Sequence, residues 1–297
     1  MAGNVSDKRL IKNPSTPVNW FLRIGALIAF INMRRRDERW PVWPVKQLLA
    51  LVAVMVAIVL LVMFVVDPPF LALLRQHNLS SNPVFQLVTF VGKSNWILIT
   101  TGSLVVLMSL LSPDRVRGRL YAVWNRVFLT SWFVFYSVAV SGLATLGAKF
   151  LVGRIRPSYN IGESAFEFSH FSHNYAFNSF PSGHSTTAGA MAMAMALLLP
   201  NLRWPIVAGW LVVASSRFII GAHFPSDVIA GVAVGMAITW IYARSMARRR
   251  MLFEFDKNGG LQLRRPEFAP LRLTLKMFKQ TLIGDANFKA GSKSQKG

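Results

Sequence analysis

The sequence predicts an all-α membrane protein in which six transmembrane helices form one bundle. Hydrophobic residues make up 53% of its 297 residues and charged residues only 15%, whereas a soluble domain carries about 25% charged residues. The mean hydropathy is +0.40. Six segments approach the roughly 20 apolar residues that a helix needs to cross a bilayer. This composition excludes an ordinary soluble domain and a disordered or fibrous protein.

The first three spans are predicted from runs that contain no Lys, Arg, Asp or Glu. Residues 48–66 form the first span, which lies between Lys46 and Asp67. Residues 96–111 and 127–146 form the second and third spans. The third is rich in aromatic side chains, which are typical of the interfacial belts of membrane helices.

The last three spans are predicted at residues 185–199, 205–220 and 227–242. Only a few residues connect them, so consecutive spans must be antiparallel neighbours. Alanines crowd the fourth span, and Gly231 and Gly235 form a small-xxx-small pair in the sixth. Because small residues let helix backbones approach closely, these spans are expected to pack tightly.

An earlier apolar stretch, residues 20–31, is too short to span a membrane and contains Arg23. No signal-peptide cleavage site follows it, so it is predicted to be a helix that lies in the membrane interface. It belongs to a cytoplasmic N-terminal segment, residues 1–47. The six-span domain then covers residues 48–242, and residues 243–297 form a basic cytoplasmic tail, either on the inner leaflet or solvated.

The net charge of +21 is of the size found in nucleic-acid-binding proteins, but its distribution indicates membrane topology instead. One side of the predicted membrane holds both termini and the connections after the second and fourth spans, with 27 basic and 8 acidic residues. The other side holds 6 basic and 4 acidic residues. By the positive-inside rule, both termini are cytoplasmic and the connections after spans one, three and five are extracytoplasmic. No nucleic-acid partner is predicted.

Three clusters of polar residues lie on the low-charge side, where ionisable groups beside membrane spans are functional candidates. The first contains Lys149 and Arg156. A spacing of seven residues returns a helix to nearly the same face, so both cations are expected to point at one anion. Alternatively, they are basic side chains that snorkel at a helix end.

The second cluster, residues 180–187, opens the fourth span. Ser182 and Gly183 provide backbone N–H donors at a helix N-terminus, a common way to hold phosphate. His184 is placed to donate a proton to a group bound there. In the structural alternative, Ser182 only caps the helix and Gly183 forms a turn.

The third cluster, residues 216–227, connects the fifth and sixth spans and contains Arg217, His223 and Asp227. A carboxylate four residues after a histidine can fix the tautomer of the imidazole, which frees the other ring nitrogen as a nucleophile or base. Asp227 is equally suited to cap the sixth helix. The predicted topology brings all three clusters to one membrane face, so we expect them to converge.

These clusters resemble the three signatures of the type-2 phosphatidic acid phosphatase (PAP2) and haloperoxidase superfamily, in its bacterial integral-membrane lipid phosphatase branch. The matching segments are residues 149–157 (K-x6-R-P), 181–184 (P-S-G-H) and 216–227 (S-R-x5-H-x3-D). The resemblance implies a phosphatase in which His223 attacks phosphorus, Asp227 orients His223, and His184 protonates the leaving group. It further implies that the phosphate is held by five residues: Lys149, Arg156, Ser182, Gly183 and Arg217.

No metal or cofactor is predicted. The chain has no cysteine, and Asp227 is the only acid in the three clusters, so the carboxylates of a two-metal site are missing. His170 and His173 have a possible metal-ligand spacing, but no cysteine or carboxylate pair accompanies them.

The predicted partners are the bilayer and a lipid phosphate or diphosphate, with the site facing the periplasm of a bacterial inner membrane. Undecaprenyl diphosphate, phosphatidate, phosphatidylglycerol phosphate and lipid A 1-phosphate all fit this description. A phosphotransferase that uses the same intermediate, and a non-catalytic lipid or anion transporter, are the alternatives. The sequence does not determine the oligomeric state.

Overall fold

The computed structural model describes residues 45–76, 83–110, 119–160, 162 and 164–264. The predicted interfacial helix at residues 20–31 lies outside them, as do nearly all of the N-terminal segment and the last 33 residues of the tail. The chain divides into two units, and the described part of the first is residues 104–110 and 119–128. All other described residues, and every predicted site residue, belong to the second unit.

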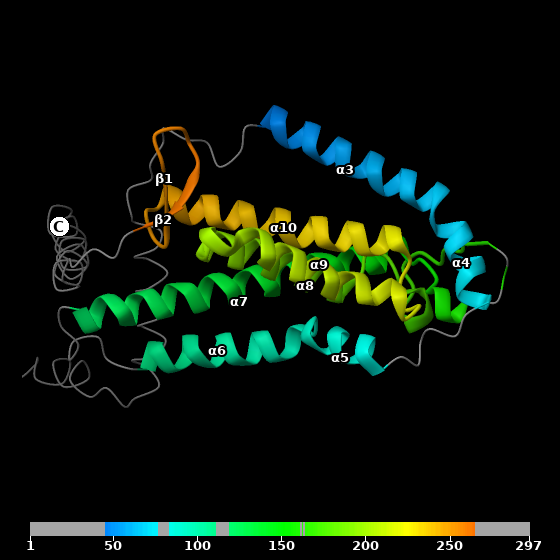
Figure 1. The fold of residues 1–297 in the computed structure, drawn as a ribbon, viewed down its shortest axis with the longest axis horizontal. Coiled ribbons are helices and arrows are strands. Elements are labelled where there is room, and N and C mark those ends of the chain that lie inside the picture. The colour runs from blue at the N-terminus through cyan, green and yellow to red at the C-terminus, as the bar shows by residue number, and fades with distance from the viewer. Residues whose placement is uncertain (1–44, 77–82, 111–118, 161, 163, 265–297) are drawn as a thin grey trace, which may run out of the picture. The chain divides into compact units, whose positions relative to one another are not determined.

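The described part of the chain contains eight α-helices and one β-hairpin (Figure 1). The helices are α3 (Val45–Val65), α4 (Asp67–Gln76), α5 (Pro83–Val91), α6 (Ser94–Leu110), α7 (Arg119–Val152), α8 (Gly183–Leu198), α9 (Arg203–Ile219) and α10 (Pro225–Arg248). Single 3-10 turns lie at Pro157–Tyr159, Tyr175–Phe177 and Pro200–Leu202. Within the described residues, each of the six predicted spans is helical over all but its last residue at most.

Four helical segments are long and apolar enough to cross a bilayer: Leu48–Val65, Val84–Leu110, Ala122–Val152 and Pro225–Arg248. The second of these includes α5 and α6, which a turn at Gly92 and Lys93 separates. Helices α8 and α9 have 16 and 17 residues, which at about 1.5 Å per residue is shorter than a bilayer core of about 30 Å. The structure therefore supports a multi-pass membrane protein with four candidate spans, and the predicted count of six stays a prediction.

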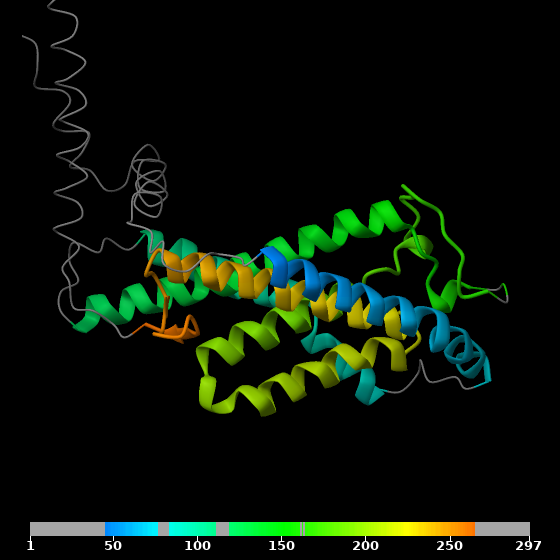
Figure 2. The same ribbon diagram turned by 90° about the horizontal axis from the view of Figure 1, so that it is seen from above.

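Helices α8, α9 and α10 lie side by side, as both views of the ribbon show (Figures 1 and 2). The small residues predicted to permit close packing lie at the contact between α8 and α10. A Cβ atom at Gly231 would be 2.5 Å from the carbonyl oxygen of Ser182. A Cβ atom at Gly235 would overlap the carbonyl oxygen of Thr186. The predicted tight packing is thus confirmed, and it brings the N-terminal ends of α8 and α10 together.

We expect Gly235→Ala to destabilise the protein by about 1–3 kcal/mol, because the added methyl group overlaps the backbone of α8. Gly209→Ala on α9 is the matched control, since its Cβ would meet no described atom within 4 Å. Replacing a helical glycine by alanine there should be neutral or stabilising, by about 0.5–1 kcal/mol. Thermal unfolding of both variants in detergent measures the difference, and equal melting temperatures would contradict the proposed close contact.

The beginning of the C-terminal tail is folded, which the sequence did not predict. Helix α10 runs six residues beyond the predicted end of the sixth span, to Arg248. Strands β1 (Phe253–Phe255) and β2 (Leu261–Leu263) then pair antiparallel. Phe253 is fully buried and packs edge-on against Phe133 of α7, with ring centroids 4.9 Å apart. The apolar residues of this segment are therefore core, and the fold contains one small sheet beside its helices.

Candidate active site

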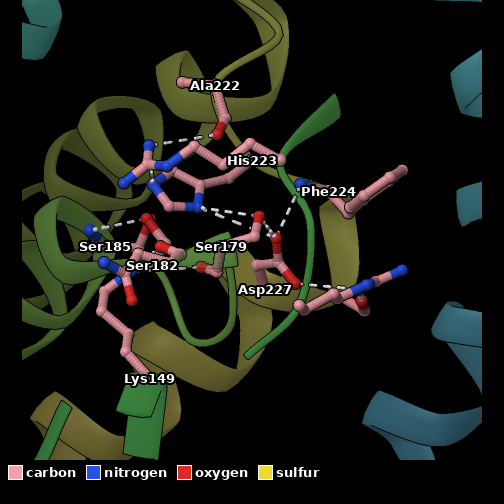
Figure 3. Close-up of polar contacts among 12 residues, drawn as sticks. Lys149, Ser179, Ser182, Ser185, Ala222, His223, Phe224 and Asp227 are labelled. Atoms are coloured by element: carbon pink, nitrogen blue, oxygen red, sulfur yellow. Dashed lines mark hydrogen bonds and ion pairs between the residues drawn. The ribbon is translucent and has the colours of Figure 1, made fainter. Parts of the chain in front are cut away.

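The ends of four helices bring the predicted site residues together in the second unit. Arg156, which follows α7, has a terminal nitrogen 3.5 Å from Nε2 of His223, which precedes α10. The backbone N–H of Ser182, at the start of α8, donates to the carbonyl of Asp227 in the first turn of α10, over 3.0 Å. Lys149 extends from α7 toward the segment that precedes α8 (Figure 3).

The expectation that Lys149 and Arg156 share one helical face is wrong, because α7 ends at Val152. Gly153 has a φ of +61°, the left-handed conformation with which glycine commonly terminates a helix. A Cβ atom there would also collide with the carbonyl oxygen of Ser169. Arg156 therefore lies in extended backbone beyond the helix. The two cations approach the site from a helix and from a loop, and not along one face.

Three cations surround the site and are largely buried: Lys149, Arg156 and Arg217. They lie within electrostatic range of one another. Lys149 Nζ donates to the carbonyl oxygen of Ser179 over 3.3 Å, and Arg156 Nε donates to that of Tyr175 over 3.2 Å. Among the described residues, the buried Nε of Arg217 has no hydrogen-bond partner. Buried donors are normally paired, and an anionic ligand would provide a partner for this one. The three positive charges also favour an anion.

The N-terminus of α8 combines a helix cap with an accessible backbone. Ser182 is the N-cap residue, and its hydroxyl oxygen accepts from the N–H and the hydroxyl of Ser185, over 3.4 and 2.9 Å. The hydroxyl hydrogen of Ser182 stays available to a further acceptor. A Cβ atom at Gly183 would meet no described atom within 4 Å, so packing does not demand glycine there. The backbone N–H of Ser182, which was expected to be a free donor, is instead used by the carbonyl of Asp227, so that part of the expectation is wrong. The Ser182 hydroxyl and the backbone of Gly183 stay candidates for contacts with phosphate.

The surroundings of His223 favour a single tautomer. The Ser179 hydroxyl lies 3.5 Å from Nδ1, and Oδ2 of Asp227 lies 3.7 Å from it. Ser179 donates its own hydrogen to Asp227 Oδ2, so both groups present acceptors to Nδ1. The other nitrogen, Nε2, faces the guanidinium of Arg156, which can only donate. A proton on Nδ1 satisfies both sides, so Nε2 is the unprotonated nitrogen and its lone pair faces Arg156.

Asp227 also helps to start α10, although not as the N-cap residue that the alternative interpretation predicted. It occupies the third helical position, and its Oδ2 accepts from the backbone N–H of Phe224 over 3.0 Å. The N-cap residue itself is Phe224. One carboxylate therefore both anchors the helix start and faces the imidazole of His223.

The pKa of His223 is lowered from 6.5 to about 3, chiefly by burial. The hydrogen bond and charge of Asp227 act to raise this pKa, whereas the charges of Lys149 and Arg156 contribute to lowering it. A lowered histidine pKa means that the imidazole is neutral at every pH well above 3, so at neutral pH its free nitrogen carries a lone pair. Neutrality is the state that a nucleophilic histidine requires.

His184 lies in the first turn of α8, just before the predicted span at residues 185–199. Burial lowers the pKa of His184 to about 4, and nearby cations, first Arg217 and then Lys93, add to this effect. The free imidazole is therefore neutral at pH 7. An anion bound among these cations would offset their charge and act to raise the pKa of His184.

Several residues near the site were not predicted from the sequence. Ser179 contacts both His223 and Asp227, and Arg154 forms an ion pair with Asp227. Lys93, in the turn between α5 and α6, acts electrostatically on His184. Arg154 and Lys93 are among the few charged residues on the low-charge side, and this position alone makes them functional candidates. Ser179 gives no such signal, because an isolated serine is common in any loop.

Each of the two loop histidines packs against a phenylalanine. His170 Nδ1 lies 3.1 Å from the carbonyl oxygen of Leu151, and its ring stacks on Phe168. The ring of His173 packs on Phe150, with centroids 5.1 Å apart. Within the part of the chain that the structure describes, no three His, Cys, Asp or Glu side chains are grouped as a metal site.

Comparison with known proteins relates this geometry to a family. The family model described as the PAP2 superfamily matches residues 130–251, which include every predicted site residue. A lipid A 1-phosphatase from Rhizobium johnstonii is 37% identical over 179 residues, which are 59% of this chain and 71% of that protein. The undecaprenyl-diphosphatase BcrC from Bacillus subtilis is 38% identical over 68 residues, 22% of this chain and 34% of that protein.

A solved structure from Bacillus subtilis, described as the first transmembrane PAP2 type phosphatidylglycerolphosphate phosphatase, is 18% identical to this chain. The match has a TM-score of 0.32 and covers 75% of this chain and 92% of that one. The family model and the extended similarity to the Rhizobium protein identify the family. This chain therefore belongs to the PAP2 superfamily.

Proposed function

We propose that this PAP2-family lipid phosphatase hydrolyses a membrane lipid phosphate or diphosphate through a phosphohistidine formed on His223. The observation that carries the proposal is the environment of this imidazole. Its Nδ1 faces two acceptors, Ser179 and Asp227, while its Nε2 faces the cation of Arg156. A phosphate held by Arg156 would place its phosphorus next to the free lone pair of Nε2.

In the first step, the lone pair of Nε2 forms a bond to phosphorus and the bond between phosphorus and the lipid oxygen breaks. His184 gives its proton to that oxygen, so the lipid leaves as an alcohol or, from a diphosphate, as a monophosphate. The phosphorylated imidazole is positively charged, and the carboxylate of Asp227 faces its Nδ1–H. In the second step, water attacks phosphorus and gives a proton to His184, and the bond between nitrogen and phosphorus breaks to release phosphate.

The cations supply the charge stabilisation that phosphoryl transfer needs. Negative charge in the transition state lies on the three equatorial oxygens of the phosphoryl group, and preorganised donors are most effective where little water reaches. Lys149, Arg156 and Arg217 are largely buried before any ligand binds. The backbone N–H of Gly183, at the positive end of the helix dipole of α8, adds a donor. These groups suffice to hold the phosphoryl oxygens without a metal.

We propose a lipid A-type glycolipid phosphate as the first substrate to test. The similarity to the Rhizobium lipid A 1-phosphatase extends over 71% of that protein, whereas the similarity to the undecaprenyl-diphosphatase covers 34% of it. An amphiphilic substrate also suits a site at the ends of apolar helices, because its acyl chains can stay in the bilayer. The charge distribution favours six spans, with both termini cytoplasmic and the site on the opposite, periplasmic side.

A phosphate-release assay across a panel of lipids tests this function. The purified full-length protein in detergent is offered lipid A, undecaprenyl diphosphate, phosphatidate and phosphatidylglycerol phosphate, each with and without EDTA and orthovanadate. We expect the highest release from lipid A, resistance to EDTA, and inhibition by vanadate, which mimics the five-coordinate transition state. Release that EDTA abolishes, or no release from any lipid, would contradict the proposal.

Labelled phosphate distinguishes the alternatives. Label that appears on a second lipid instead of in solution would identify a phosphotransferase, in which an alcohol replaces water in the second step. Movement of lipid between leaflets of a vesicle, without any phosphate release, would identify a transporter. Label in free phosphate supports the hydrolase.

A further inference from the structure

A fully buried arginine joins two carboxylates beside the site. One terminal nitrogen of Arg154 lies 2.8 Å from Oδ1 of Asp227, and the other lies 2.8 Å from Oδ2 of Asp67. All three side chains are completely buried. The guanidinium also lies 4.1 Å from the ring centroid of Phe224. Buried charges are costly unless they are paired and hydrogen-bonded, and here the positive charge is shared between two negative ones.

Asp67 belongs to a distant part of the chain, at the first residue of α4, just after the first predicted span. Its carboxylate accepts from the backbone N–H of Ser226 over 3.2 Å and from the Ser226 hydroxyl. The same hydroxyl accepts from Arg154 over 2.8 Å. The four residues Asp67, Arg154, Ser226 and Asp227 therefore form a closed set of contacts that ties α4 to the first turn of α10.

This set of contacts controls which oxygen of Asp227 faces the histidine. Oδ1 is held by Arg154, so the carboxylate cannot rotate freely. Oδ2 is the oxygen that accepts from Ser179 and from Phe224, and it is the one that faces Nδ1 of His223. The orientation of the catalytic carboxylate is thus fixed from the side opposite to the imidazole.

The second carboxylate also affects the electrostatics. An arginine paired with Asp227 alone would neutralise most of the negative charge that Asp227 presents to His223. Because Asp67 also pairs with Arg154, it offsets part of the positive charge of Arg154. Asp227 then exerts a stronger negative field on a positively charged phosphohistidine. Removing the charge of Asp67 should therefore destabilise the intermediate without disturbing the cations that are proposed to bind phosphate.

We propose that Asp67 and Arg154 are positioning residues that act on His223 through Asp227. The proposal rests on the function proposed above, in which His223 is the nucleophile. Outer partners that orient metal-ligating histidines contribute about 10–100-fold to activity, and we expect effects of similar size on kcat for these two residues. KM should change by less than about twofold when Asp67 or Arg154 is replaced, because the proposed phosphate-binding cations Lys149, Arg156 and Arg217 are retained.

The test uses the full-length protein in detergent and compares Asp67→Asn in two backgrounds, the wild type and Asp227→Asn. We expect Asp67→Asn to lower kcat about 10–100-fold in the wild type and to have no further effect on the residual kcat of Asp227→Asn. Such non-additivity is the signature of a residue that acts through another. A purely structural role would lower both rates equally, and that result would overturn the proposal.

Arg154→Lys provides the second variant, should Asp67→Asn not fold. Lysine keeps the charge but lacks the planar fork that bridges two carboxylates, so kcat should fall while KM is retained. Tyr242→Phe is the stability control, since it loses the hydrogen bond from Trp132 far from the site and should keep its kcat. A folded Arg154→Lys with wild-type kcat would also overturn the proposal. Absence of phosphate release by the wild type would instead contradict the function itself.

Discussion

His223→Ala should reduce phosphate release from the best lipid substrate by about 10⁴-fold or more, as loss of a catalytic nucleophile does elsewhere. In the proposed mechanism no neighbour replaces it. Nε2 of His223 is the nitrogen that faces Arg156, and His184, the other histidine near the cations, has the proposed role of proton donor. The rate is measured as phosphate released per folded enzyme in detergent, with thermal unfolding to confirm that the variant is folded.

His170→Ala is the matched control for this variant. His170 is an exposed histidine whose Nδ1 lies near the carbonyl oxygen of Leu151, outside the cluster of cations, and its loss should leave the rate unchanged.

Brief incubation with labelled substrate adds a direct test. The wild type should retain a label that is labile to acid and stable to alkali, and His223→Ala should retain none. Wild-type activity in His223→Ala would show that another group attacks phosphorus.

His184→Gln should lower kcat for a lipid phosphate by about 10²–10⁴-fold, the usual contribution of a positioned general acid. The loss should depend on the leaving group. An alkoxide needs a proton to leave, whereas a nitrophenolate does not. We therefore expect a much smaller loss when the variant hydrolyses p-nitrophenyl phosphate, and the comparison of kcat for the two substrates is the measurement.

His173→Gln is the control, because this histidine packs on Phe150 in the loop and has no proposed part in proton transfer. An equal loss on both substrates in His184→Gln would mean that His184 holds the phosphate instead of protonating the leaving group. Such a result would leave His223 as the nucleophile and reassign only the role of His184.

The helices could be predicted from the sequence because their signals are local. A run of apolar residues such as 48–66 has no stable alternative to a helix in a membrane, and the structure has α3 there. The close packing of α8 on α10 was also readable, because Gly231 and Gly235 recur on one helical face. The hairpin at residues 253–263 could not be predicted from the sequence. Apolar residues that are buried in a hairpin form the same sequence pattern as apolar residues of a tail that lies on a membrane surface.

The site was predicted only in part, for reasons that concern backbone geometry. The sequence placed Lys149 and Arg156 on one helix, but Gly153 adopts a positive φ and ends α7 between them. A glycine within an apolar run is compatible with a helix that continues and with one that stops. Only its contact with the backbone of Ser169 decides between these outcomes, and that contact depends on a loop that returns from further along the chain.

Hydrophobicity, helix length and motif spacing are properties of short segments, so the class of protein, the helices and the residues of the candidate site could be predicted from them. The orientation of those residues depends on tertiary contacts. Asp67 and Arg154 are 87 positions apart, and Asp67 and Ser226 are 159 apart, yet they share one buried cluster. Contacts between such distant residues arise from the packing of whole helices, and no local pattern in the sequence records them.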